Sequence, residues 1–104
     1  MSDGFVTVAR VGDIPEGGVK VVRLEDQSVA VFHLEGRYYA IEDVCTHDGG
    51  PLAEGTLEGR VIECPRHGAK FDVTTGAVVC LPAMAPVPTY AVRLVGDEIQ
   101  VGWA

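Results

Sequence analysis

The sequence has few basic residues and no region where they gather. Of its 104 residues, 8 are Lys or Arg and 15 are Asp or Glu, so the formal net charge is −7. A chain of this charge with no basic stripe repels nucleic acid, and we expect no nucleic-acid partner. The acidic balance suits docking on a basic patch of a redox partner. It is equally ordinary for a protein that is acidic for solubility, so charge discriminates weakly.

Long apolar runs are also missing. No run approaches the roughly 20 residues needed to cross a bilayer, so no membrane anchor is expected. The first residues, Met1 to Gly4, show neither the basic start nor the apolar stretch of a signal peptide. The three cysteines are an odd number and cannot complete a disulfide framework. A reducing cytoplasm is the expected compartment.

No helical periodicity of useful length is present. Short runs rich in Val, Ile, Tyr and Phe are broken by Gly, Pro and Asp, which predicts an all-β chain folded as a sandwich or partly open barrel. The length predicts one domain spanning residues 1–104. The predicted strands are 5–10, 19–24, 29–34, 37–41, 60–63, 69–72, 77–79, 89–95 and 98–101. The predicted hairpin connections are 25–27, 35–36, 74–76 and 96–97.

Two short motifs combine a cysteine with a histidine. Cys45-Thr46-His47 has the spacing C-x-H, and Cys64-Pro65-Arg66-His67 has the spacing C-x2-H. Two thiolates and two imidazoles arriving on two separate loops make a four-ligand metal site. A Rieske-type [2Fe–2S] centre has this composition, because two His replace two Cys on one of its irons.

A tetrahedral zinc site is the alternative interpretation of these four residues, since structural zinc sites accept mixed Cys and His ligands. Zinc modules, however, usually pair like residues, as in C-x2–4-C and H-x3–5-H. Here each pair is mixed, and the first gap is a single residue. A diiron cluster explains mixed pairs better, because each loop can send its Cys to one iron and its His to the other. Unrelated cysteines and histidines are the remaining alternative.

On these two motifs the chain resembles the Rieske ferredoxins, and in particular the small ferredoxins of aromatic-ring dioxygenase systems of the biphenyl and naphthalene type. The resemblance extends over nearly the whole chain. It implies a Rieske fold, in which a small three-stranded cluster-binding subdomain, here about residues 43–81, inserts into a larger antiparallel base. It also implies one Rieske-type [2Fe–2S] cluster. Within it, Cys45 and Cys64 bind the inner iron, while His47 and His67 bind the outer iron near the surface.

The resemblance further implies a role without catalysis. The chain would carry one electron from an NAD(P)H-dependent flavoprotein ferredoxin reductase to a terminal non-haem iron oxygenase, docking through the rim around His47 and His67. It is too short to hold an oxygen-activating domain as well, so it is expected to be an electron carrier and not an enzyme. The alternatives that remain open are an accessory to iron–sulfur assembly, the small subunit of a nitrite reductase, and a zinc-stabilised interaction module.

The residues flanking the motifs predict a low reduction potential. High-potential Rieske proteins have an extra Cys in each cluster loop and place Ser and Tyr hydroxyls near the cluster sulfurs. Here Gly50 or its neighbours and Arg66 occupy the places of those cysteines, and Ala69 and Phe71 occupy the places of those hydroxyls. Fewer hydrogen bonds to sulfur favour the oxidised state.

The remaining candidate residues are weaker indicators of function. The glycines at 49, 50 and 68 suit either a backbone that wraps closely around sulfide or ordinary tight turns. The segment 81–88, with three prolines, is expected to cover the cluster or simply to connect two strands. Cys80 is expected to be a free, partly buried thiol, His33 a strand residue and Trp103 a packing residue of the base. Asp48, Arg66 and Lys70 flank the predicted ligands and are expected to be solvated or to tune docking.

Overall fold

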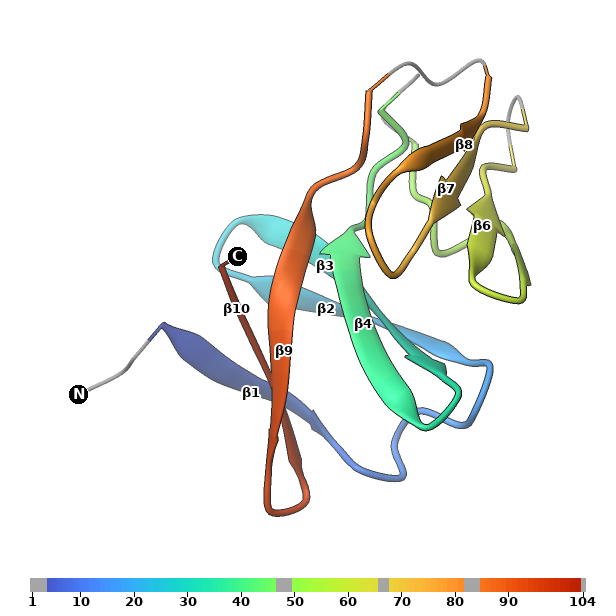
Figure 1. Cartoon of the computed structure of the whole chain (residues 1–104). Coiled ribbons are helices and arrows are strands. Elements are labelled where there is room, and N and C mark those ends of the chain that lie inside the picture. The colour runs from blue at the N-terminus through green and yellow to red at the C-terminus, as the bar shows by residue number, and fades with distance from the viewer. Residues whose placement is uncertain (1–3, 47–49, 66–67, 82–84, 104) are drawn as a thin grey trace.

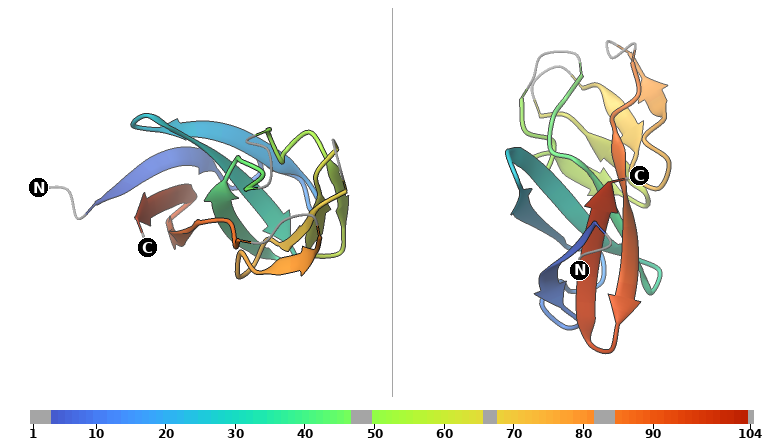
Figure 2. Two further views of the ribbon diagram at one scale, coloured as in Figure 1. Left: turned by 90° about the horizontal axis from the view of Figure 1, so that it is seen from above. Right: turned by 90° about the vertical axis from the view of Figure 1, so that its left-hand side faces the viewer.

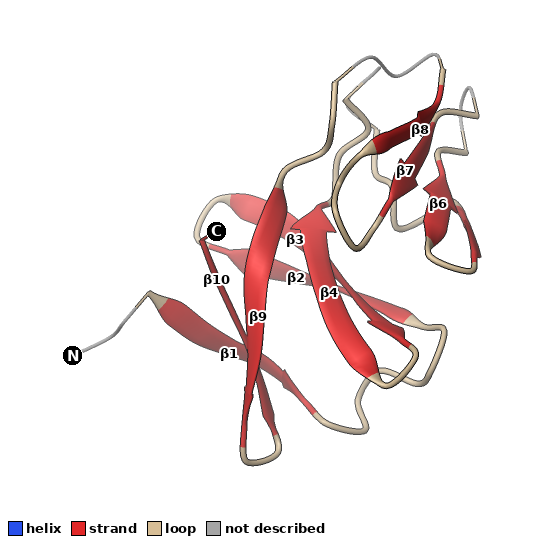
Figure 3. Ribbon diagram, viewed as in Figure 1, coloured by secondary structure: helices blue, strands red, loops and turns tan. Residues whose placement is uncertain are grey.

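The computed structural model describes residues 4–46, 50–65, 68–81 and 85–103. Ten strands form two separate antiparallel sheets (Figures 1 and 3). The strands are β1 Phe5–Arg10, β2 Val19–Leu24, β3 Gln27–Leu34, β4 Arg37–Glu42, β5 Thr56–Glu58, β6 Val61–Glu63, β7 Lys70–Asp72, β8 Val78–Cys80, β9 Thr89–Val95 and β10 Glu98–Trp103. The all-β prediction is confirmed. The described residues include no helix long and apolar enough to span a bilayer.

The larger sheet has the order β1-β10-β9-β4-β3-β2. Its two edge strands, β1 and β2, come into contact, so the sheet curls toward a barrel (Figure 2). The smaller sheet has the order β5-β6-β7-β8 and stands at one end of the base (Figure 1). All four of its strands fall within the range 43–81 predicted for the insertion.

The smaller sheet has four strands where three were predicted. The additional strand is β5, Thr56–Glu58, whose three residues include one apolar side chain and are too short a run to predict a strand. Gly55 precedes it, and a Cβ there would lie 1.9 Å from the Glu63 carbonyl oxygen. A glycine at that point permits the close approach of the two backbones. Gly55 was visible in the sequence, but a single glycine before a three-residue run is weak evidence for a strand.

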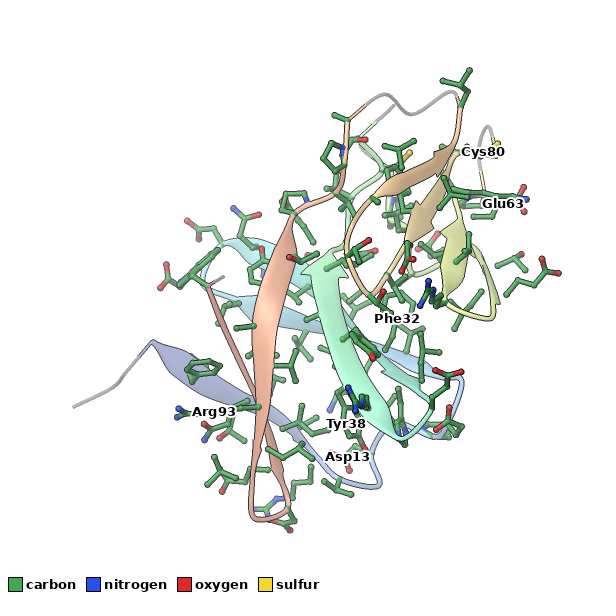
Figure 4. All side chains as sticks on the ribbon, viewed as in Figure 1. Asp13, Phe32, Tyr38, Glu63, Cys80 and Arg93 are labelled. Atoms are coloured by element: carbon green, nitrogen blue, oxygen red, sulfur yellow. The ribbon has the colours of Figure 1, made fainter. Side chains whose placement is uncertain are left out.

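Strand β3 contributes side chains to two hydrophobic cores, because both of its faces are buried. Val29 and Val31 point into the core of the base, together with Ile99 and Val101. The alternate residues Ala30, Phe32 and Leu34 point into a second core that the base shares with the smaller sheet. The period of two in a strand produces this division. Figure 4 shows Phe32 where β3 faces the smaller sheet.

Candidate metal centre

Two cysteine thiols lie in the core that joins the two sheets. Cys45 follows β4 and is fully buried, and Cys64 follows β6 with 1% of its surface exposed. Neither cysteine is in a disulfide, and both belong to the same buried cluster as Leu52 and Phe71. A thiolate buried among apolar side chains requires a compensating positive charge, which a metal supplies.

Each cysteine begins a loop that is closed in the same way. The Cys45 amide donates to the Gly50 carbonyl at 2.7 Å, and the Cys64 amide donates to the Ala69 carbonyl at 2.7 Å. In both loops the acceptor lies five positions after the cysteine. The two predicted ligand pairs therefore start two loops with a common backbone frame.

The second loop also turns on a glycine. The Gly68 amide donates to the Cys64 carbonyl at 3.2 Å, and Gly68 has a φ of +79°. A residue with a side chain rarely adopts this conformation, so the turn explains the glycine. Its place immediately after the predicted ligand His67 is also compatible with a backbone that approaches a ligand closely.

The predicted ligands His47 and His67 lie outside the described residues, as do Gly49, Asp48, Arg66 and Met84. Thr46 is the last described residue before the gap in the first cysteine loop, and Gly68 is the first described residue after the gap in the second. Within the described ranges, no group of three or more His, Cys, Asp and Glu side chains is placed to hold a metal ion. The assignment of the histidines as ligands stays a prediction.

A hydrogen bond joins the first cysteine loop to the proline-rich segment. The Thr46 hydroxyl donates to the Ala85 carbonyl at 2.6 Å, across 39 positions of sequence. We call residues 81–88 the proline segment. Sequence reasoning expected this segment near the cluster only through family resemblance. It missed Thr46 altogether, because no local pattern signals a contact with a residue so far along the chain.

The side chains around the cysteines are apolar. Ala69 and Phe71 are both fully buried in the core that contains the two thiols. Neither has a hydroxyl, and the Thr46 hydroxyl is already bonded to a carbonyl. Ala69 and Phe71 therefore cannot donate a side-chain hydrogen bond to sulfur, and the low reduction potential stays a prediction.

The other candidates lie outside this centre. Cys80 was expected to be partly buried and is instead exposed, because it lies in β8, the edge strand of the smaller sheet (Figure 4). The His33 ring contacts the Ile14 carbonyl at 2.8 Å and stacks on Tyr38 at 4.3 Å. Trp103 is 51% exposed, with its ring 5.3 Å from that of Tyr90.

A cleft of about 640 Å³ opens between the two sheets. Its lining includes Glu35 and Tyr39 of the base, together with Gly59, Arg60 and Thr74 from turns of the smaller sheet. These turns precede β6 and follow β7, whereas the second cysteine loop follows β6 and precedes β7. The cleft is therefore at the other end of the smaller sheet from Cys64 and takes no part in the predicted metal centre.

Residues 4–91 match the family described as the Rieske [2Fe-2S] domain. The chain belongs to this family. The Rieske domain found here is 39% identical, over 97% of both chains, to the "Naphthalene 1,2-dioxygenase/salicylate 5-hydroxylase systems, ferredoxin component" of Ralstonia sp. Among solved structures it resembles the ferredoxin of carbazole 1,9a-dioxygenase from Nocardioides aromaticivorans IC177. That match has a TM-score of 0.93 and 33% identity, and it covers 98% of this chain and 100% of the other.

A further structural match is a complex of reduced oxygenase and oxidised ferredoxin in carbazole 1,9a-dioxygenase. The matching chain has a TM-score of 0.91 and 35% identity, with coverage of 97% of this chain and 94% of that one. The Rieske fold and the resemblance to dioxygenase ferredoxins are thus confirmed. A Rieske domain implies one Rieske-type [2Fe–2S] cluster as cofactor. Two buried cysteine side chains on loops closed by the same hydrogen bond fit this group.

Proposed function

We propose that this Rieske ferredoxin carries single electrons to the terminal oxygenase of an aromatic-ring dioxygenase system and performs no catalysis itself. The observation that carries the proposal is the pair of buried cysteines, Cys45 and Cys64, that begin two loops with the same backbone hydrogen bond. The relatives are ferredoxin components of such systems.

We propose that Cys45 and Cys64 bind the inner iron and that His47 and His67 bind the outer iron. The cluster, when bound, supplies a site that accepts and releases one electron. Leu52 and Phe71 pack in the same core as the two cysteines and would exclude water from the cysteine side of the cluster. Neutral imidazoles from His47 and His67 would make the iron they bind easier to reduce than thiolates would.

The docking surface that we propose is the apolar rim at this end of the molecule. Its described residues include Pro51, Pro65, Leu81, Ala85 and Pro86, all of which are exposed. Protein interfaces are depleted of charge at their centres, and this rim is apolar. A terminal oxygenase would dock here to receive the electron, and a flavoprotein ferredoxin reductase would dock here to supply it. The solved complex of a similar ferredoxin with the oxygenase of carbazole 1,9a-dioxygenase supports the first of these partners.

We further propose that residues 1–104 form one domain with an insertion at about 43–81, and that the protein works in a reducing compartment such as the cytoplasm. That none of the three cysteines is in a disulfide supports the second point. Two other roles, in iron–sulfur assembly or as a nitrite reductase small subunit, receive less support because the relatives described above are dioxygenase components.

Reconstitution tests the proposed function. The holoprotein is combined with NADH, a flavoprotein reductase and the terminal oxygenase of a naphthalene-type dioxygenase, and cis-dihydrodiol formation is measured. Product should depend on the added ferredoxin and saturate with its concentration. A fully loaded protein that is reduced chemically but never speeds product formation with dioxygenase components would contradict the proposal.

A further inference from the structure

The hairpin that carries the second cysteine loop ends in two residues of opposite charge. β6 ends at Glu63 and β7 begins at Lys70, and these residues lie directly opposite each other in the antiparallel ladder. We propose that the Glu63 carboxylate lowers the reduction potential of the cluster and that the Lys70 ammonium partly offsets this effect. The inference rests on the proposed function, because the predicted ligand Cys64 follows Glu63 directly in the chain.

The Glu63 side chain lies on the outer face of the smaller sheet. Its neighbours Ile62 and Cys64 are each 1% exposed and belong to the core that joins the two sheets, whereas Glu63 is partly exposed. Lys70 likewise lies between two fully buried neighbours. Figure 4 shows Glu63 on the side of the smaller sheet that faces away from the base. One layer of backbone therefore separates the carboxylate from the buried side, where the Cys64 side chain lies.

The Glu63 carboxylate also lies close to the far end of the second cysteine loop. Its Oε2 atom is 3.4 Å from the position that a Cβ of Gly68 would take. Gly68 follows the predicted ligand His67, and its amide donates to the Cys64 carbonyl at 3.2 Å. The carboxylate is therefore near both the start and the end of this loop, with no side chain of Gly68 in between.

Neither charge of the pair is neutralised within the part of the chain that the structure describes. No ion pair of the described residues includes Glu63 or Lys70, although the two lie opposite each other. Reduction adds one negative charge to the cluster, and a nearby carboxylate opposes this by Coulomb repulsion. The apolar core behind the sheet screens the repulsion less than water would. Lys70 acts in the opposite direction and more weakly, because it is three positions from the nearest predicted ligand, His67.

A carboxylate near the first cysteine loop has a different role. Asp43 precedes Cys45 by two positions, and its Oδ1 atom accepts a hydrogen bond from the Ala53 amide at 2.7 Å. Replacement of Asp43 would remove this bond together with the charge. The Glu63 carboxylate makes no such bond to another described residue, so its replacement reports the effect of charge alone.

The test replaces each charged side chain by glutamine, in Glu63→Gln and Lys70→Gln. Glu58→Gln is the matched control, because Glu58 is exposed and carries the same charge on the same face of the smaller sheet. It lies opposite Val61, at the end of β6 away from the second cysteine loop. The midpoint potential of each holoprotein is measured by protein-film voltammetry at one pH and one ionic strength. EPR of the reduced proteins shows whether each variant keeps its Rieske signal.

Glu63→Gln should raise the midpoint potential by an amount equal to about a threefold to tenfold change in the ratio of reduced to oxidised protein. A tenfold change is about 59 mV for one electron. Lys70→Gln should lower the potential by a smaller amount, and Glu58→Gln should not shift it measurably. Equal potentials in Glu63→Gln and the unmodified protein, or equal shifts in Glu63→Gln and Glu58→Gln, would overturn the proposal.

Failure of the proposed function gives a different result. Absence of a Rieske signal in the unmodified protein would overturn both the role of Glu63 and the proposed function. The expected shifts in a protein that never supports cis-dihydrodiol formation would contradict the proposed function alone and support the role of Glu63.

Discussion

The amide of Cys45 and the amide of Cys64 make the same hydrogen bond, each to the carbonyl five positions further on, at 2.7 Å in both loops. The shared closure means that the two thiols leave their loops from equivalent backbone positions. It also uses both cysteine amides, so neither is available to donate to a sulfur of its own loop. Two like frames carrying C-x-H and C-x2-H suit a centre with one Cys and one His from each side.

The apolar environment of the cysteines predicts a low midpoint potential, near the lower end of the Rieske range of roughly −150 to +300 mV. Ala69→Ser places a hydroxyl in this fully buried core. A hydroxyl that donates to sulfur stabilises the reduced state by about 1 kcal/mol, which for one electron is roughly 40 mV upward. Protein-film voltammetry measures the change. Ala69→Gly, which alters side-chain size without a hydroxyl, should not reproduce the rise, and a native midpoint well above zero would refute the low-potential account.

Gly76 should accept a side chain poorly, for two separate reasons. It has a φ of +81°, and a Cβ there would lie 2.2 Å from the Val87 carbonyl oxygen. Gly76→Ala should therefore cost roughly 2 kcal/mol or more of unfolding free energy, since the strain of φ and the clash add. Gly59→Ala is the control, because Gly59 has a φ of +63° but open space around its Cβ position. Its cost should be only about 1 kcal/mol. Equal losses for both variants in urea unfolding would show that the approach to Val87 is unimportant.

The Glu16 carboxylate stabilises the turn between β3 and β4. It accepts hydrogen bonds from the backbone amides of Glu35 and Gly36, which have φ values of 54° and 76°. These bonds, with a smaller contribution from His33, lower the pKa of Glu16 below its usual 4.5. A lowered pKa stabilises the fold above pH 4.5, and this stabilisation is lost as the pH falls through the lower, folded-state pKa.

Glu16→Gln should thus lower the melting temperature at neutral pH and flatten its decline below about pH 4.5. Thermal unfolding between pH 3 and 7 measures the effect. Glu54→Gln removes the same charge from an exposed position where no described amide bonds to the carboxylate, and it should retain the decline. A decline in Glu16→Gln as steep as in the unmodified protein would contradict the role of this carboxylate.

Local pattern determined much of the fold, and long-range geometry determined the rest. The alternation in β3 and the glycine-containing turn after Leu34 were enough to predict a hairpin, and β1, β2 and β9 have the predicted bounds. The short strand β5 was missed because Thr56, Leu57 and Glu58 derive their strand conformation from pairing with β6, not from their own propensities. The exposure of Cys80 likewise depends on β8 being a sheet edge, which only the topology reveals.

In the candidate centre, too, the residues could be predicted from local pattern, whereas their long-range contacts could not. The cysteines and histidines were recognisable from type and spacing, since a Rieske cluster needs those donors. The bond between Thr46 and Ala85, and the fit of Gly76 against Val87, join residues that are distant in sequence and have no local signature. Such contacts arise only once the folded chain places Ala85 beside Thr46 and Val87 beside Gly76.

The central claim is that Cys45, His47, Cys64 and His67 hold a Rieske cluster, and low-temperature EPR of the dithionite-reduced, anaerobically prepared protein tests it most directly. The account predicts a rhombic signal with an average g below that of all-cysteine [2Fe–2S] ferredoxins. The signal should be lost in His67→Ala and retained in His33→Ala, since His33 lies in the base and contacts Ile14. A colourless protein that contains stoichiometric zinc, or an intact Rieske signal in His67→Ala, would contradict it.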